Sequence, residues 1–311
     1  MIRTVISIAL PVDERLLIQK NVISHGTGKK RICIVTGTHG DELEGQYVCF
    51  QLNKIVQENL DKLNGTIEIY PALNPLGIDS ITRGIPNFDL DMNRLFPGNP
   101  DGTMAERVAY AIFQDLQGAD MVIDIHSSNI FLREIPQVRV NVNTAERLVP
   151  YAKLLNTDFI WVHEAATVLE ATLAHSLNTA GTPTLVVEMG VGMRINHGYG
   201  NRLVTGIFNL MHELGMWSEQ DESHLISRPV VSVADKVSFL NAEASGIFFT
   251  EIRNNIIVDK GEEIGCIVNP LTGEVLQEVT ATVHGLLFTL RAYPVVYQGS
   301  LLARIHQLDE S

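Results

Sequence analysis

The stretch Arg31-Ile-Cys-Ile-Val-Thr-Gly-Thr-His-Gly-Asp-Glu42 decides the fold that this sequence predicts. Its first part, Arg31 to Gly37, is an apolar and β-branched run typical of a buried strand, and a glycine-containing loop follows it. Apolar residues then recur close to a helical period from Glu42 to Leu60, and Gly65 precedes a second strand, Thr66 to Tyr70. A strand, a helix and another strand in this order predict a parallel α/β unit.

The same alternation of short strands and longer helices continues to about residue 216, and it predicts an α/β domain whose mostly parallel sheet is flanked by helices. The first eleven residues, a short apolar run interrupted by polar residues, are expected to form one more strand. Further strands are expected at Met121 to Ile125, Gln137 to Val142, Phe159 to Val162 and Leu185 to Met189. Further helices are expected at Met104 to Leu116, Thr144 to Leu155, Val168 to Thr179 and Gly200 to Leu214.

A second region follows a polar, acidic stretch from Ser218 to Arg228. Because Pro229 ends any helix there, we expect one domain over residues 1–227 and a second domain over residues 228–311. In the second region short strands alternate with turn signals such as Asn269-Pro270 and Thr272-Gly273. This texture predicts a small all-β domain.

Composition and charge exclude several classes of protein. The chain has 311 residues, of which 45 % are hydrophobic and 19 % charged, an ordinary globular composition. Its 23 Lys and Arg against 36 Asp and Glu give a net charge of −13, which opposes a general nucleic-acid or anionic-membrane role. The three cysteines are too few for a disulfide framework or a cysteine zinc site. Without an apolar window of about 18 residues or a signal peptide, we expect no membrane span and a cytoplasmic location.

Candidate metal ligands follow the ends of two predicted strands. His39 and Glu42 are three residues apart, which lets an imidazole on the loop and a carboxylate in the first helical turn bind one cation. His126 follows an apolar strand, so it is expected at the carboxyl-end edge of the sheet, where open α/β folds bind ligands. Nitrogen and oxygen ligands suit zinc, and three of them leave a fourth place for water, as in catalytic sites. The alternative is that these are ordinary polar residues at strand and loop ends, as we expect for Asp41 and Glu44.

A further carboxylate leaves the sheet at Glu188, after the apolar run Leu185-Val-Val. A buried carboxylate at this point needs a cation, a hydrogen bond or a proton, although it could also only cap the loop. Beside a metal-activated water, Glu188 is suited to take a proton and pass it to a leaving amine.

A local group of cations lies in the loop that contains Arg83 and the segment Asp91-Met-Asn93-Arg94. The planar guanidinium of arginine matches a carboxylate with two hydrogen bonds, and an arginine aimed at a developing oxyanion accelerates acyl transfer. Surface solvation is the alternative for a single arginine.

Together these signals resemble the aspartoacylase and succinylglutamate desuccinylase family, a branch of the zinc carboxypeptidase superfamily. The resemblance covers most of the chain. The family motif Gly-x-His-Gly-x-Glu is met by Gly37 to Glu42, Asp-x-His by Asp124 to His126, and Asp-x-Asn-Arg by Asp91 to Arg94. The catalytic glutamate of the family, which follows a strand, corresponds to Glu188, and the arginine that polarises the scissile carbonyl corresponds most simply to Arg83. The motifs occur in the order that the family requires.

The resemblance implies a role for each of these residues. His39, Glu42 and His126 would bind one zinc ion per subunit, and Asp91 would orient one of the bound imidazoles. Asn93 and Arg94 would bind the α-carboxylate of the substrate, Arg83 would stabilise the oxyanion, and Glu188 would move the proton.

The resemblance also implies a zinc-carboxypeptidase-like mixed sheet flanked by helices, followed by a small β-barrel-like or sandwich domain at the mouth of the active site. Tyr293 and Tyr297 are candidates to reach the substrate from that domain, and the sequence does not decide between them or for either. Aspartoacylases proper use another arginine upstream of the catalytic glutamate, but residues 174–184 contain no arginine or lysine. Aspartate specificity is therefore not expected.

The expected activity is that of a zinc-dependent amidohydrolase that removes the acyl group from an N-acyl amino acid or a related small amide. Two alternatives stay open: a zinc metallocarboxypeptidase acting on a small peptide, and a metal-dependent binding protein, which would have no use for Glu188. The expected partner is thus a small N-acyl amino acid or short peptide, with neither nucleic acid nor membrane, and a homo-oligomer is left open.

Overall fold

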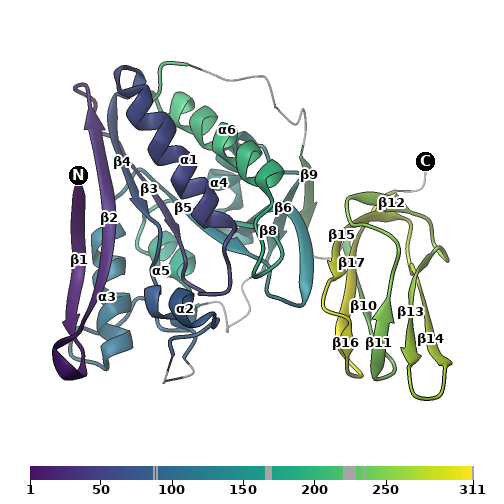
Figure 1. The fold of residues 1–311 in the computed structure, drawn as a ribbon. Coiled ribbons are helices and arrows are strands. Elements are labelled where there is room, and N and C mark those ends of the chain that lie inside the picture. The colour runs from purple at the N-terminus through teal and green to yellow at the C-terminus, as the bar shows by residue number, and fades with distance from the viewer. Residues whose placement is uncertain (87, 89, 165–169, 220–228, 234–235, 310–311) are drawn as a thin grey trace.

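The computed structural model describes residues 1–311 except 87, 89, 165–169, 220–228, 234–235 and 310–311 (Figure 1). Its α-helices are α1 (Glu44–Glu58), α2 (Pro75–Ser80), α3 (Met104–Leu116), α4 (Ala145–Ala152), α5 (Leu173–Thr179) and α6 (His197–Glu213). The strands of the first region are β1 (Ile2–Ala9), β2 (Arg15–His25), β3 (Arg31–Thr36), β4 (Gly65–Tyr70), β5 (Met121–Ser127), β6 (Leu132–Asn141), β7 (Phe159–His163), β8 (Thr184–Gly190) and β9 (Val230–Val233). Those that follow are β10 (Val237–Asn241), β11 (Gly246–Phe249), β12 (Ile256–Val258), β13 (Glu263–Asn269), β14 (Glu274–Thr280), β15 (Gly285–Arg291), β16 (Val295–Val296) and β17 (Leu301–Gln307).

A large mixed sheet forms the centre of the molecule. In the described residues its order is β1-β2-β4-β3-β5-β8-β6-β15-β17-β10; in addition β7 pairs with β6, β9 with β7, and β12 with β15. The neighbours β4, β3, β5 and β8 are parallel, whereas β2 and β6 run antiparallel to this group. The α/β fold with a mixed sheet flanked by helices is therefore confirmed.

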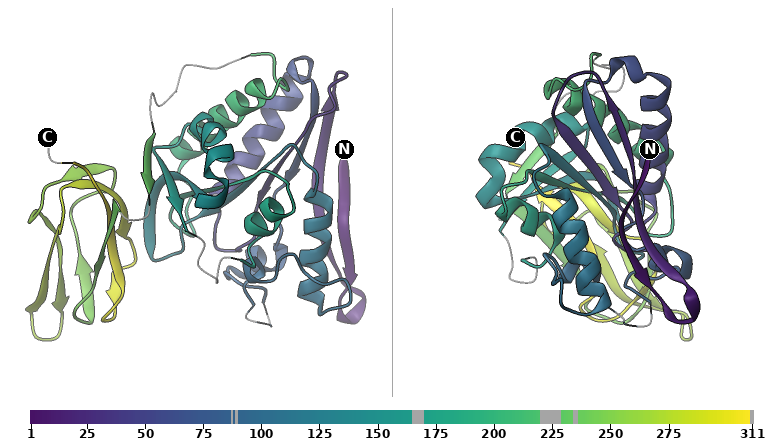
Figure 2. Two further views of the ribbon diagram at one scale, coloured as in Figure 1. Left: turned by 180° about the vertical axis from the view of Figure 1, so that it is seen from behind. Right: turned by 90° about the vertical axis from the view of Figure 1, so that its left-hand side faces the viewer.

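The two faces of this sheet carry different residues. On one face Ile123, Ile125 and Val187 belong to an apolar cluster that includes residues of α1, α4 and α6. The ribbon views show the long helices α1 and α6 side by side over this part of the sheet (Figure 1 and Figure 2). Side chains alternate along a strand, so Asp124 and Glu188 point to the opposite face. There α3 lies against β1 and the short α5 against β8, which leaves polar positions of β5, β8, β6 and β7 lining a cavity.

Strand β6 connects the central sheet with the C-terminal region. Residues 137–141 pair with β7 in parallel, and the same part of β6 pairs with β8 in antiparallel orientation. At the start of the strand, Leu132 to Glu134 pair with β15 in place of β7, and Glu134 also pairs with Gly190 of β8. Pro136 lies at the register shift between these two parts, as expected of a residue without an N–H to donate.

The C-terminal region is all-β, as the sequence predicts. A second sheet of order β14-β13-β11-β16 faces β10, β15 and β17, and the two enclose an apolar cluster that includes Phe248, Ile267 and Leu302. The expected boundary at residues 218–228 lies almost wholly outside the described residues, so the division into 1–227 and 228–311 stays a prediction. Strand β9 begins just after this boundary in the sequence, but it pairs with β7 and so extends the sheet of the first region.

Several predicted elements have different ends in the structure. The strand expected at Gln137 to Val142 is the longer β6, and the helix expected at Thr144 to Leu155 is α4 followed by a 3₁₀ turn from Lys153. The helix expected from Val168 becomes α5 only at Leu173, and its expected first two residues lie outside the described residues. Strand β2 is not among the predicted strands, because a buried Lys20 and an exposed Leu17 interrupt its alternation of apolar and polar residues.

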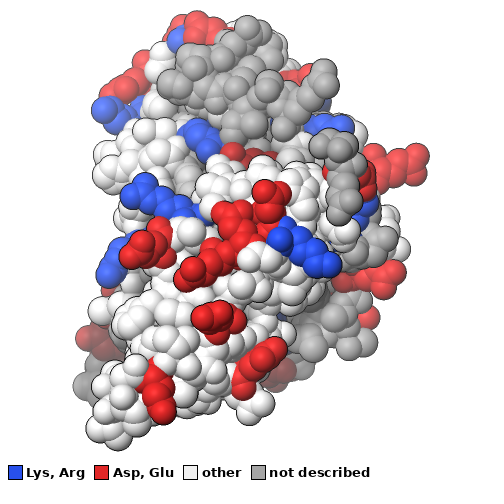
Figure 3. Space-filling model, turned by 90° about the vertical axis from the view of Figure 1, so that its right-hand side faces the viewer, with Lys and Arg blue, Asp and Glu red and all other residues white. Residues whose placement is uncertain are grey.

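The surface reflects the acidic composition. Figure 3 shows Asp and Glu side chains gathered in the middle of one face, with fewer Lys and Arg around them. Among the described residues, no helix is both long and apolar enough to cross a membrane.

Candidate active site

The loop between β3 and α1 carries the first two candidate metal ligands. It begins with Gly37, whose φ of +68° favours glycine. Gly40 packs so closely on the backbone of Gly77, in α2, that a Cβ atom there would collide with it. His39 and Glu42 lie on this tightly packed loop and are each only 3 % exposed.

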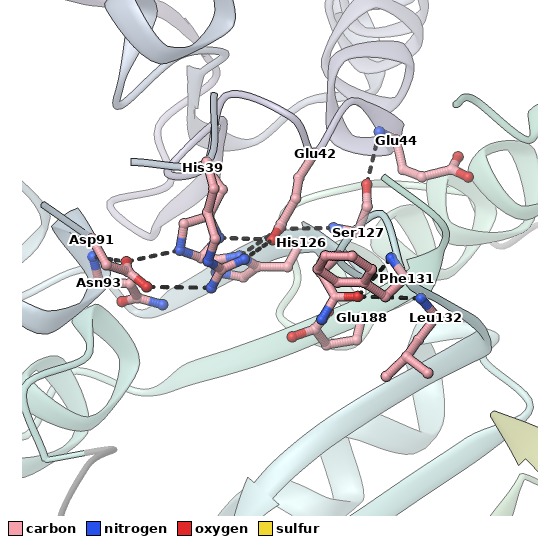
Figure 4. A network of polar contacts seen from close by, with 12 residues as sticks. His39, Glu42, Glu44, Asp91, Asn93, His126, Ser127, Phe131, Leu132 and Glu188 are labelled. Atoms are coloured by element: carbon pink, nitrogen blue, oxygen red, sulfur yellow. Dashed lines mark hydrogen bonds and ion pairs between the residues drawn. The ribbon is translucent and has the colours of Figure 1, made fainter. Parts of the chain in front are cut away.

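His39, Glu42 and His126 converge, as Figure 4 shows. His39 Nδ1 lies 2.8 Å from Glu42 Oε1, and His126 Nδ1 lies 3.0 Å from Glu42 Oε2. One potential ligand atom from each of the three side chains lies within 4.8 Å of the other two. The sequence placed Glu42 in the first helical turn, but α1 begins only at Glu44, so Glu42 is a loop residue between the imidazoles.

A carboxylate lies beside the other nitrogen of each imidazole. His39 Nε2 donates to Asp91 Oδ1 at 2.9 Å (Figure 4). His126 Nε2 lies 3.2 Å from Asp124 Oδ1. Such carboxylates fix the plane of a ligating ring and leave its other nitrogen for the metal. The sequence prediction included Asp91 in this role but gave none to Asp124. The signal for it was the i, i+2 spacing to His126, which places both side chains on one face of β5.

The electrostatics of the three residues fit a bound cation. Burial disfavours a charged imidazole, yet Glu42 raises the pKa of His39, and Asp124 raises the pKa of His126 well above its ordinary value. Burial also opposes ionisation of Glu42, but the two histidines hold its pKa far below the usual carboxyl range. His39 Nδ1 is buried and makes no hydrogen bond within the described part of the chain. Two imidazole nitrogens and one carboxylate are a ligand set that zinc accepts.

The loop before α3 brings the candidate substrate-binding residues to the same place. Arg83 donates to Glu42 Oε1 at 2.8 Å and to Asp91 Oδ2 at 3.3 Å. The backbone N–H of Asn93 also donates to Asp91, and the exposed Arg94 lines the cavity beside it. The structure therefore places the predicted arginine side chains next to the predicted metal ligands.

Glu188 lies one strand away from the histidine of β5. In the pairing of β5 with β8, Glu188 is directly opposite His126. Its side chain lines the cavity, and burial raises the pKa of Glu188 to about 7, although the nearby Arg139 acts to lower it. A carboxyl group with this pKa exchanges a proton readily near neutral pH.

All of the residues given a metal-binding, catalytic or carboxylate-binding role face one cavity of about 640 Å³. His39, Glu42, Arg83, Asn93, Arg94, His126 and Glu188 contribute to its lining. Neither Tyr293 nor Tyr297 is among the described residues that line it, and the two side chains are 46 % and 72 % exposed.

The structure adds residues to this cavity that the sequence did not predict. Arg139 and Trp161 extend from β6 and β7, and Arg304 extends from β17 in the C-terminal region. Glu134 lies among them and is 1 % exposed. The alternation Gln-Val-Arg-Val-Asn at residues 137–141 signalled a strand with one polar face, but that pattern is also typical of a strand facing solvent.

Comparisons with known proteins agree with this geometry. Residues 28–214 match the model of the succinylglutamate desuccinylase/aspartoacylase catalytic domain. An N-alpha-acetyl-L-2,4-diaminobutyric acid deacetylase from Halomonas elongata is 24 % identical over 305 residues, which cover 95 % of this chain and 87 % of the relative.

Solved structures show the same fold. The product-bound ectoine utilization protein EutE from Ruegeria pomeroyi has a TM-score of 0.81 at 22 % identity, covering 97 % of this chain and 93 % of that one. A succinylglutamate desuccinylase from a Silicibacter species has a TM-score of 0.82 at 23 % identity, covering 95 % and 90 %. The family model matches more than half of the sequence, so the chain belongs to the succinylglutamate desuccinylase/aspartoacylase family.

Proposed function

We propose that the protein is a zinc-dependent amidohydrolase that removes the acyl group from an N-acyl amino acid or a related small amide. One observation carries this proposal: the His39, Glu42 and His126 group shares a cavity with Glu188 and Arg94. Ligands for a metal, a proton carrier and a carboxylate-binding cation are the parts that amide hydrolysis of such a substrate needs. The relative from Halomonas elongata, named as a deacetylase of an N-acetylated amino acid, supports the same class of reaction.

The residues of the cavity would have different roles in the reaction. Zinc held by His39, Glu42 and His126 would acidify a water molecule and polarise the carbonyl of the amide. Arg94 and Asn93 would bind the α-carboxylate and so fix the substrate in the cavity. Arg83, whose guanidinium contacts Glu42, is close enough to the ligands to donate to the developing oxyanion.

Glu188 would serve as both base and acid. It would accept the proton of the attacking water and then give that proton to the leaving nitrogen, so that the amine departs uncharged. Its raised pKa of about 7 suits both transfers. The C-terminal region also lines the cavity through Arg304, which favours small substrates over long peptides.

A kinetic experiment with a matched control tests this proposal. The wild-type protein, E188Q and E213Q would be assayed on a panel of N-acyl amino acids and a panel of short peptides, with and without a chelator. Glu213 is the exposed last residue of α6, so E213Q makes the same chemical change away from the cavity. We expect E188Q to keep its zinc and to lose turnover by about 10²- to 10⁴-fold.

Other outcomes would support a different function or a different mechanism. Hydrolysis of peptides but not of N-acyl amino acids would identify a metallocarboxypeptidase. Binding of a panel compound without turnover at saturating zinc would identify a binding protein. Full turnover by zinc-loaded E188Q would remove Glu188 from the mechanism.

A further inference from the structure

Four side chains of alternating charge form a row of ion pairs that ends at Glu188. Arg139 Nη1 lies 3.2 Å from Glu188 Oε1, and Arg139 Nη2 donates to both carboxylate oxygens of Glu134 at 3.0 and 2.9 Å. Arg304 Nη1 donates to Glu134 Oε1 at 2.6 Å. This row of ion pairs thus runs from β8 through β6 to β17 of the C-terminal region.

Arg139 is fixed in this row of ion pairs on several sides. Its two terminal nitrogens contact different carboxylates, and its guanidinium lies over the ring of Trp161, 5.7 Å from the centroid. Trp161 is directly opposite Arg139 in the pairing of β6 with β7. Because a guanidinium is planar and rigid, contacts at both Nη atoms and over one face fix its position as well as its charge.

Glu188 depends on this arginine for its orientation. Among the described residues, Arg139 is the one side chain that pairs with the Glu188 carboxylate. Pairing with β5 and β6 fixes the backbone of Glu188, but not the torsions that aim its carboxylate. A misplacement of about 1 Å at a reacting group costs about 10²-fold in rate, so the residue that sets these torsions affects turnover.

The C-terminal region supplies Arg304, the residue at the other end of this row of ion pairs. Glu134 is 1 % exposed, and a carboxylate buried to that degree needs its cationic partners. Arg304 takes one of its oxygens, and Thr289 of β15 contacts the same oxygen at 3.4 Å. Without Arg304, the whole charge of Glu134 would act on Arg139 and draw the guanidinium away from Glu188.

We propose that Arg139 is a positioning residue that aims the Glu188 carboxylate, and that Arg304 sets the position of Arg139 through Glu134. The C-terminal β-region is then part of the catalytic apparatus. This inference rests on the proposed hydrolase function, and it assigns to Arg139 no contact with the substrate.

The first test compares R139K and R139Q with R133Q. Arg133 lies on the same strand with its side chain exposed. R133Q therefore removes a positive charge from β6 and leaves the row of ion pairs unchanged. We expect kcat to fall about tenfold in R139K and about 10²-fold in R139Q at nearly constant KM, because lysine restores the charge but not the two-pronged geometry. R133Q should behave as wild type. Zinc content and thermal unfolding, measured for each variant, show whether the metal site and the fold are retained.

Chemical rescue separates positioning from stability. Millimolar guanidinium should restore part of the kcat of R139A, whereas the same concentration of sodium chloride should not. A rise of KM at unchanged kcat in R139K would overturn the proposal, since it would place Arg139 on the substrate. Unchanged kinetics in folded R139Q would overturn it as well.

The second test concerns Arg304. R304Q should lower kcat, and the double variant R304Q/R139Q should lose little more than R139Q alone, because both act along one path. Fully additive losses would refute the link through Glu134. If the wild-type protein hydrolyses no amide, the proposed function fails; if it does and these variants match it, only the present inference fails.

Discussion

Replacing Asp124 with asparagine should weaken zinc binding while leaving the fold intact. Asp124 is 1 % exposed, and its Oδ1 atom lies 3.2 Å from His126 Nε2, on the side of the ring away from Glu42. An asparagine oxygen can still accept from this nitrogen, so the ring keeps its orientation, but the negative charge that makes the imidazole a stronger ligand is lost.

The expected size follows from this partial loss. Losing such a carboxylate usually costs about 10- to 100-fold in metal affinity, which is about 1.4 to 2.7 kcal/mol. Because orientation is preserved in D124N, we expect a value in the lower half of this range. Turnover at saturating zinc should change less than the affinity does, since Asp124 does not contact the substrate in the proposed mechanism.

Competition with a chromophoric chelator at fixed pH measures the zinc dissociation constant of each variant. D61N is the matched control, because Asp61 lies exposed in a 3₁₀ turn after α1 and loses the same charge. Circular dichroism of both variants reports whether the sheet is retained. A zinc affinity of folded D124N equal to that of D61N would show that the Asp124 contact contributes nothing to the metal site.

Three further predictions test other parts of the site and fold. G40A should lower the free energy of unfolding by about 1 to 3 kcal/mol, because its new methyl group meets the backbone of Gly77. Calorimetry measures this change. Unchanged stability would argue against the packing of the loop on α2. R94Q should raise KM by about tenfold or more with little change in kcat, because binding of the α-carboxylate is the same in the ground and transition states; a fall in kcat alone would contradict this role. Burial opposes ionisation of Glu68, but its hydrogen bond from Lys20 lowers its pKa. The stabilisation that Glu68 provides is therefore complete above the ordinary carboxyl pKa and is lost as the pH falls through its lowered pKa, so the difference in urea stability between wild type and E68Q should shrink in acid.

The sequence predicted those residues of the site whose positions follow from the pattern of the strand or loop that carries them. His39, His126 and Glu188 each follow an apolar strand, and the carboxyl ends of parallel strands meet at one edge, so their proximity follows from pattern and topology. Arg139 lies within β6, and no local pattern distinguishes a polar face toward a cavity from one toward water. Arg304 contacts a residue 170 positions away in the chain, across a pairing of β6 with β15 that turn signals do not predict.

The same contrast explains how the candidate site is supported. Asp91 accepts from His39, from the N–H of Asn93 and from Arg83, so one carboxylate connects a candidate metal ligand, the loop of the candidate substrate-binding residues and an arginine. This support comes from a short loop, and a short motif in the sequence encodes it. The support of Glu188 instead comes from distant strands through Arg139, and within the described ranges it shares no side chain with the contacts of Asp91. In the proposed mechanism, metal binding and proton transfer therefore depend on different carboxylate–arginine contacts, although β8, which carries Glu188, pairs directly with β5, which carries His126.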